Sequence, residues 1–168
     1  MDIQVRQQAF AEIDAPWIVL FVFEQQTQPS VALGDSTFGG LLTRLLIQKE
    51  LGTSPGDLSV FHGPPSKPES SILVVGLGEQ EYVEPEDVYT AGYALAKRLF
   101  RKQRSRLSVL LPDLLIYHSD RLLSSLIEGI IAGCQSPGLR KGERNRYFFE
   151  TLTLVLPPGS EEDVERRI

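Results

Sequence analysis

Residues Trp17 to Phe23, WIVLFVF, form an uninterrupted run of apolar residues. A strand that is apolar on both sides must be covered on both sides, so this run predicts a strand near the centre of a sheet that has helices on each face. Five further segments predict strands: Ile3 to Arg6, Leu58 to Phe61, Ile72 to Leu77, Leu107 to Leu111 and Thr151 to Leu156.

Three segments between these strands carry apolar residues at helical spacing. The first follows the capping cluster Gly34-Asp35-Ser36-Thr37 and is predicted to end at Gly52 and Pro55. The second starts at Glu84-Pro85 and the third at about Ser119, with Gly138 as its terminator. The residues predicted to face the core are Phe38, Leu41, Leu42, Leu45 and Leu46 in the first helix; Val88, Ala91, Gly92, Leu95 and Leu99 in the second; and Leu122, Leu123, Leu126, Ile127, Ile130 and Ile131 in the third.

Alternation of strands and helices is typical of an α/β fold with a mixed, mainly parallel sheet and helices on both faces, in three layers. A chain of 168 residues with 42% hydrophobic content can bury one substantial core, and two domains would be cramped.

The charge and the cysteine count exclude several classes of protein. A formal net charge of -5 argues against a protein whose main task is to hold nucleic acid. The single cysteine, Cys134, excludes an internal disulfide framework and falls in a helical apolar pattern, which predicts a buried thiol. The N-terminus does not have the pattern of a secretory signal, and no apolar run is long enough to cross a bilayer. A cytoplasmic location is the resulting expectation.

Two segments carry a resemblance to a known family. They are GGLLTRLLIQKELGTSPGDLSVFHGPPSKPESSILVVGLG, from Gly39 to Gly78, and ETLTLVLP, from Glu150 to Pro157. In order and spacing they resemble the non-catalytic N-terminal domain of the leucyl aminopeptidases, which is related in fold to macro domains. The resemblance implies a domain over residues 1–158 and, over residues 159–168, the start of a linker helix to a missing catalytic domain.

For the parent protein, the resemblance implies a cytosolic hexamer that removes N-terminal amino acids from peptides with two divalent metal ions, commonly zinc, manganese or magnesium. Nothing in this chain resembles the family's Asn-Thr-Asp-Ala-Glu-Gly-Arg signature, which supplies metal-binding carboxylates in the catalytic domain. No catalytic, cofactor-binding or metal-binding residue is therefore predicted here. The expected role is assembly or regulation, with the catalytic domain and the other subunits as partners.

Two smaller features invite other functions. Gly76-Leu77-Gly78 follows a strand as a dinucleotide-binding turn does, but a third glycine would fall at Glu81 and the next helix opens with acidic residues, which favours a structural turn. The histidines His62 and His118 have no spacing that builds a metal site, and both are predicted to lie in loops or at strand ends.

Two clusters of basic residues leave an alternative function open. They are Lys97, Arg98, Arg101, Lys102, Arg104 and Arg106 in the first cluster, and Arg140, Lys141, Arg144 and Arg146, next to Tyr147, Phe148 and Phe149, in the second. Solvated cationic surface is the favoured interpretation because the net charge is negative. The alternative is a module that binds nucleic acid or a nucleotide such as ADP-ribose.

Overall fold

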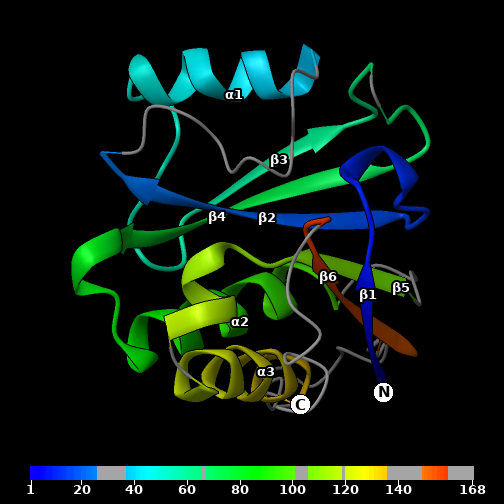
Figure 1. The fold of residues 1–168 in the computed structure, drawn as a ribbon, viewed down its shortest axis with the longest axis vertical. Coiled ribbons are helices and arrows are strands. Elements are labelled where there is room, and N and C mark those ends of the chain that lie inside the picture. The colour runs from blue at the N-terminus through cyan, green and yellow to red at the C-terminus, as the bar shows by residue number, and fades with distance from the viewer. Residues whose placement is uncertain (26–36, 66, 101–105, 119, 136–148, 159–168) are drawn as a thin grey trace, which may run out of the picture.

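The structure is a computed structural model and describes residues 1–25, 37–65, 67–100, 106–118, 120–135 and 149–158. Its centre is a sheet of six strands (Figure 1). The strands are β1 (Asp2–Gln7), β2 (Trp17–Glu24), β3 (Leu58–His62), β4 (Ser71–Glu79), β5 (Arg106–Leu110) and β6 (Thr151–Leu156). The α-helices are α1 (Thr37–Ile47), α2 (Pro85–Leu99) and α3 (Asp120–Gln135). Within the described ranges they are connected by the 3-10 turns η1 (Phe10–Glu12) and η3 (Gln80–Tyr82) and by the π-helical turn η4 (Leu114–His118).

The strands lie in the order β1-β6-β5-β2-β4-β3. All neighbours pair in parallel except β3, which runs antiparallel to β4. β2 lies between β5 and β4, and every residue from Trp17 to Phe23 is buried, so the predicted central strand is confirmed. The predicted mixed, mainly parallel sheet is also confirmed.

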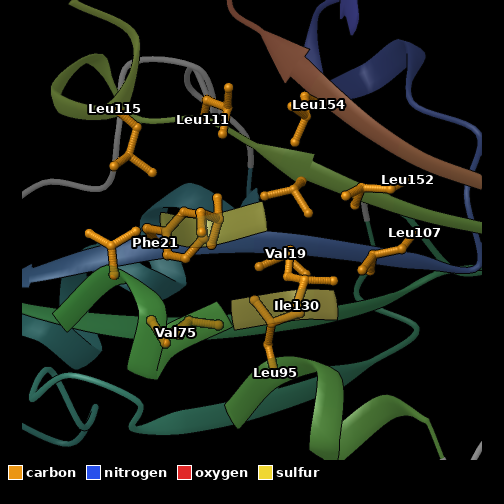
Figure 2. Packing of buried hydrophobic residues seen from close by; sticks show 14 of the residues in the cluster. Val19, Phe21, Val75, Leu95, Leu107, Leu111, Leu115, Ile130, Leu152 and Leu154 are labelled. Carbon is orange, nitrogen blue, oxygen red and sulfur yellow. The ribbon is translucent and has the colours of Figure 1, made fainter. Parts of the chain in front are cut away.

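Helices cover both faces of the sheet, with α1 on one side and α2 and α3 on the other (Figure 1). Side chains of β2 alternate between the two layers because successive residues of a strand point to opposite faces. Ile18 and Leu20 pack in the cluster that contains Phe38 and Leu42 of α1. Val19 packs instead in the cluster that contains Leu95 of α2 and Ile130 of α3 (Figure 2).

Glycines allow α2 and α3 to touch backbone to backbone. A Cβ atom at Gly92 of α2 would lie 2.6 Å from the carbonyl oxygen of Leu126, and one at Gly133 of α3 would lie 2.6 Å from that of Tyr93. A Cβ atom at Gly129 would collide with the carbonyl oxygen of Tyr89. Any larger residue at these positions would force the two helices apart.

Most residues that the helical spacing placed inward are buried or packed against the core, but the prediction for Ile131 is wrong. Its side chain is 36% exposed, whereas that of its neighbour Ile130 is fully buried. α3 meets α2 through Gly129 and Gly133 and meets the sheet through Leu126 and Ile130. Ile131 lies outside the surface of α3 that these residues form, on the side of the helix away from α2.

The predicted end of α1 at Gly52 and Pro55 is also wrong, because the helix already ends at Ile47. Lys49 adopts a left-handed conformation with φ of 57°. Its N–H donates to the carbonyl of Leu46 at 3.1 Å, and the N–H of Glu50 donates to that of Leu45 at 2.9 Å. This Schellman pattern usually uses glycine, so the lysine gave no signal in the sequence.

The start of α2 at Pro85 agrees with its prediction. α3 begins at Asp120, next to the predicted start at Ser119, and η4 precedes it unpredicted. The predicted capping residues Gly34, Asp35 and Ser36, the terminator Gly138 and the linker segment 159–168 lie outside the described residues.

Candidate functional site

The carboxyl end of β4 is a candidate ligand site, because ligands of open parallel sheets bind outside the carboxyl ends of the strands. The glycine turn Gly76-Leu77-Gly78 lies here, at the end of β4. The N–H of Gly76 donates to the carbonyl of Asp57 at 2.9 Å, and the N–H of Gly78 donates to that of Thr53 at 2.7 Å. Both glycine amides are therefore bonded to the chain's own backbone.

Close packing explains why this turn contains glycine. A Cβ atom at Gly76 would lie 2.5 Å from the carbonyl carbon of Thr53 and would collide with the carbonyl oxygen of Ser54. Gly78 has a φ of 83°, a conformation that side chains disfavour. The geometry thus gives both glycines a structural reason, and both of their amides are bonded within the chain.

The start of α2 is acidic rather than anion-binding. The N–H of Glu84 donates to Oδ2 of Asp87 at 2.9 Å, so a carboxylate of the chain occupies the end of the helix. Asp87 and Glu86 both stand in its first turn, where negative charge complements the helix dipole. An incoming phosphate would meet this negative charge.

His62 ends β3, as its predicted strand-end position requires. Its Nδ1 lies 2.9 Å from Oγ of Ser71, the residue directly opposite it in β4, and its ring meets Trp17 edge-on at a centroid distance of 5.9 Å. Ser71 is only 4% exposed, and its N–H donates to the carbonyl of Pro16 at 2.9 Å. A hydroxyl buried in this way is a poor nucleophile for a substrate arriving from solvent.

The structure describes three members of the first basic cluster. Lys97 and Arg98 are exposed in the last turn of α2, and Arg106 lies 3.6 Å from Asp14 in an exposed ion pair. Arg101, Lys102 and Arg104, and all the basic residues of the second cluster, lie outside the described residues, as do Tyr147 and Phe148. Phe149 is buried in the core.

An aromatic stripe on the outer side of α2 was not predicted. Tyr89 and Tyr93 stack at a centroid distance of 6.4 Å, and Nζ of Lys97 lies 5.5 Å from the centre of the Tyr93 ring. Their spacing of four residues is the sequence signal that could have revealed the stripe. Tyr89 is 38% exposed.

Cys134 is buried, which confirms its prediction. Burial raises the pKa of the thiol above its ordinary range, and a backbone hydrogen bond to Phe149 offsets part of that rise. Such a thiol is protonated and unreactive at neutral pH. Among the described residues, no three His, Cys, Asp or Glu side chains gather where they could hold a metal ion.

The fold and these contacts define the class of the protein. It is an open-sheet α/β domain in which the amides of Gly76 and Gly78, at the end of β4, bond to the chain itself. A family model described as "Cytosol aminopeptidase family, N-terminal domain" matches residues 19–136. The chain belongs to the cytosol aminopeptidase family, of which it carries the N-terminal domain.

Two of the solved structures that match illustrate the shared fold. A mutant of tomato leucine aminopeptidase aligns with a TM-score of 0.69 and 17% identity, covering 100% of this chain and 34% of the tomato chain. The bottromycin maturation enzyme BotP, solved in complex with Mn, aligns with a TM-score of 0.55 and 13% identity, covering 92% of this chain and 28% of BotP. This chain thus spans about a third of the length of these proteins.

The comparison with curated proteins finds no match. In the described part of the chain, no helix is both long and apolar enough to cross a membrane.

Proposed function

We propose that this chain is a non-catalytic N-terminal domain that serves assembly or regulation in a leucyl-aminopeptidase-like enzyme. The observation that carries the proposal is the match of residues 19–136 to the model of the family's N-terminal domain. Two features of the site support it: the amides of the glycine turn bond within the chain, and the thiol of Cys134 is buried.

The remainder of the proposal concerns a parent protein. That enzyme would remove N-terminal amino acids from peptides in the cytoplasm, as a hexamer, with two divalent metal ions such as manganese, zinc or magnesium bound in a separate catalytic domain. This domain would lie at the periphery and have a macro-like fold. Among the described residues no three His, Cys, Asp or Glu side chains gather where they could hold such an ion, and the metal-dependent step would belong to the catalytic domain.

An activity assay tests the proposal. The 168-residue chain is incubated with a leucine anilide and manganese, and metal binding is followed by calorimetry, with tomato leucine aminopeptidase as the positive control. We expect no turnover above a heat-killed sample and no stoichiometric binding in the micromolar range, because the described part of the chain gathers no ligand set. Turnover, or tight metal binding, would contradict the non-catalytic role.

A thermal shift assay separates this role from nucleotide binding. A ligand that binds the native state must raise the melting temperature by mass action. Since the Gly76 and Gly78 amides are already bonded to backbone carbonyls, we expect no shift with ADP-ribose or NAD at millimolar concentration. A saturable rise in melting temperature would favour the nucleotide-binding module instead.

A further inference from the structure

The outer edge of the sheet at β1 is open in the described part of the structure. β1 is the first strand in the sheet order and pairs only with β6. The N–H of Asp2 donates to the carbonyl of Glu150 at 2.7 Å, and that of Gln8 donates to the carbonyl of Leu156 at 3.2 Å. Alternate residues of a strand point their backbone groups the same way. Ile3 and Val5 therefore direct their N–H and C=O groups away from β6, toward the outside.

Natural sheet edges are usually protected by charged side chains, a proline, a bulge, an inward-pointing charge or a covering helix or loop, and of these β1 has exposed charges at Asp2 and Arg6. β1, with the sequence DIQVRQ, contains no proline, and its register with β6 is continuous over all six residues. Ile3 and Val5 are half-buried against the core on the α2–α3 side. The edge thus presents a straight strand with one apolar and one polar face.

The polar face of β1 carries opposite charges at equal distances along the strand from Gln4. Nε2 of Gln4 donates to Oδ2 of Asp2 at 2.7 Å, and a guanidinium nitrogen of Arg6 donates to Oε1 of Gln4 at 3.0 Å. A negative and a positive group thus stand two residues to either side of Gln4. The other edge strand, β3, has the sequence LSVFH, with no acidic, lysine or arginine residue.

We infer that β1 is a self-association edge, on which β1 of a second copy of this chain pairs antiparallel about a two-fold axis at Gln4. In this register Asp2 faces Arg6 of the partner subunit, and Gln4 faces its own counterpart. Ile3 faces Val5 of the partner subunit, and these are the residues whose backbone groups point outward. The charge pattern and the hydrogen-bonding pattern therefore select the same register.

Other arrangements lose one of these matches. Parallel pairing in register would place Asp2 beside Asp2 and Arg6 beside Arg6, and like charges directly opposite are destabilising. An antiparallel pair shifted by two residues would place Gln8 opposite Asp2 and would lose both ion pairs. The two-fold axis at Gln4 gives an isologous, closed dimer rather than an open fibre.

This inference rests on the assembly role proposed above and assigns that role to the exposed edge of β1. Its test is hydrodynamic and independent of the enzymatic test. An active chain would refute the non-catalytic role without affecting sedimentation. A monomeric chain would refute the edge pairing and would not affect the proposal that the chain is non-catalytic.

A charge swap provides the experiment. Sedimentation equilibrium is measured on the untagged 168-residue chain, on Asp2→Arg, on Arg6→Asp and on the double variant Asp2→Arg/Arg6→Asp. We expect a dimer for the wild type, dissociation constants raised about tenfold or more in each single variant, and recovery to within about threefold in the double variant, because the swap restores the opposite-charge pairs. Added salt should weaken the wild-type dimer.

A proline substitution tests the backbone part of the pairing. Val5→Pro removes an outward N–H and leaves the bonds to β6 in place, so it should give a folded monomer by circular dichroism and sedimentation. If Val5→Pro misfolds, the charge swap decides alone. A wild-type chain that stays monomeric to about 1 mM, or single charge variants that dimerise as the wild type does, would overturn the inference.

Discussion

The two faces of the sheet are covered by different means. On one face, α2 and α3 meet at backbone contact, where Gly92, Gly129 and Gly133 leave no room for a Cβ atom. On the other face, α1 covers the sheet, and a Cβ atom at its Gly40 would have nothing within 4 Å. The same residue type therefore serves close packing on one face and only weakens a helix on the other.

This difference shows that a glycine in a helix has no fixed effect on stability. Glycine costs about 1 kcal/mol relative to alanine in a helix interior. At Gly92 that cost is offset by the contact between two helices, whereas at Gly40 the structure shows no contact that offsets it. Changes at the two faces should therefore have opposite signs, and the predictions below test and extend this contrast.

The largest effect is expected at the contact between α2 and α3. Gly92→Ala should lower the free energy of unfolding by about 2–3 kcal/mol, because the new methyl group meets the carbonyl oxygen of Leu126 and forces the helices apart. Gly40→Ala, the matched control, should raise it by about 0.5–1 kcal/mol. Urea unfolding of both variants measures the changes. A stabilising Gly92→Ala would show that the two helices can separate at no cost.

The next largest effect is expected at the hydrogen bonds of Lys67, near the face of the sheet that α1 covers. Nζ of Lys67 donates to the carbonyl oxygens of Ala11 and Ile13, at 2.5 Å and 2.7 Å, next to a core that includes Phe10 and Ile13. Lys67→Met should cost about 1–2 kcal/mol, because it leaves two carbonyls without a charged donor.

Lys97→Met is the control for this change on the opposite face. Lys97 is exposed and stacks over a tyrosine, so its loss should cost about 0.5 kcal/mol. Equal losses in the two variants, measured by thermal unfolding, would show that the bonds of Lys67 contribute nothing beyond an exposed charge.

A gain of stability is expected at the end of α1. Lys49→Gly should stabilise the chain by about 1 kcal/mol, because glycine adopts the observed φ of 57° without a steric cost. Lys49→Ala removes the same charge and keeps the strain, so it should not stabilise. Urea unfolding compares the two, and equal effects would assign the change to charge instead.

The smallest effect concerns the pKa of Cys134. Burial raises the thiol's pKa in the folded state, so as pH rises the unfolded chain loses its proton first. The stability that this thiol contributes is fully present below the unfolded pKa of about 8.5 and is lost as pH rises through the folded pKa. Cys134→Ala should therefore show a shallower alkaline decline than the wild type in urea unfolding at a series of pH values. Identical slopes would contradict the shift.

Much of the fold followed from local patterns. The apolar run of β2 predicted its central position, and Pro85 predicted the start of α2, because both signals act within a few residues. The pairing of β1 with β6 depends on contacts between distant segments, which no local pattern encodes. The antiparallel direction of β3 follows instead from its short connection to β4, because parallel strands need a longer crossover. The end of α1 was missed since Lys49 occupies a position that glycine normally marks.

The features of the candidate site divide in the same way, into those with a local sequence signal and those that depend on contacts between distant segments. The departure of the turn at Gly76 from the dinucleotide pattern is visible in the sequence itself, because Glu81 breaks the motif. Its physical cause, the close approach of Thr53 and Ser54, became visible only in three dimensions. The spacing of four residues between Tyr89 and Tyr93 indicates an aromatic stripe on α2, which was not among the features predicted for this helix.

The pairing of β1 with β6 has a consequence for the order of events during synthesis. Asp2 pairs with Thr151, and β6 inserts between β1 and β5. Among the described strands β1 is synthesised first and β6 last, so β1 cannot pair until β6 has been made, and until then one edge of β5 is unpaired. A ribosome that stalls before residue 151 would hold a nascent chain whose sheet cannot close. The sheet is thus completed only near the end of translation of these residues, and such long-range closure slows folding.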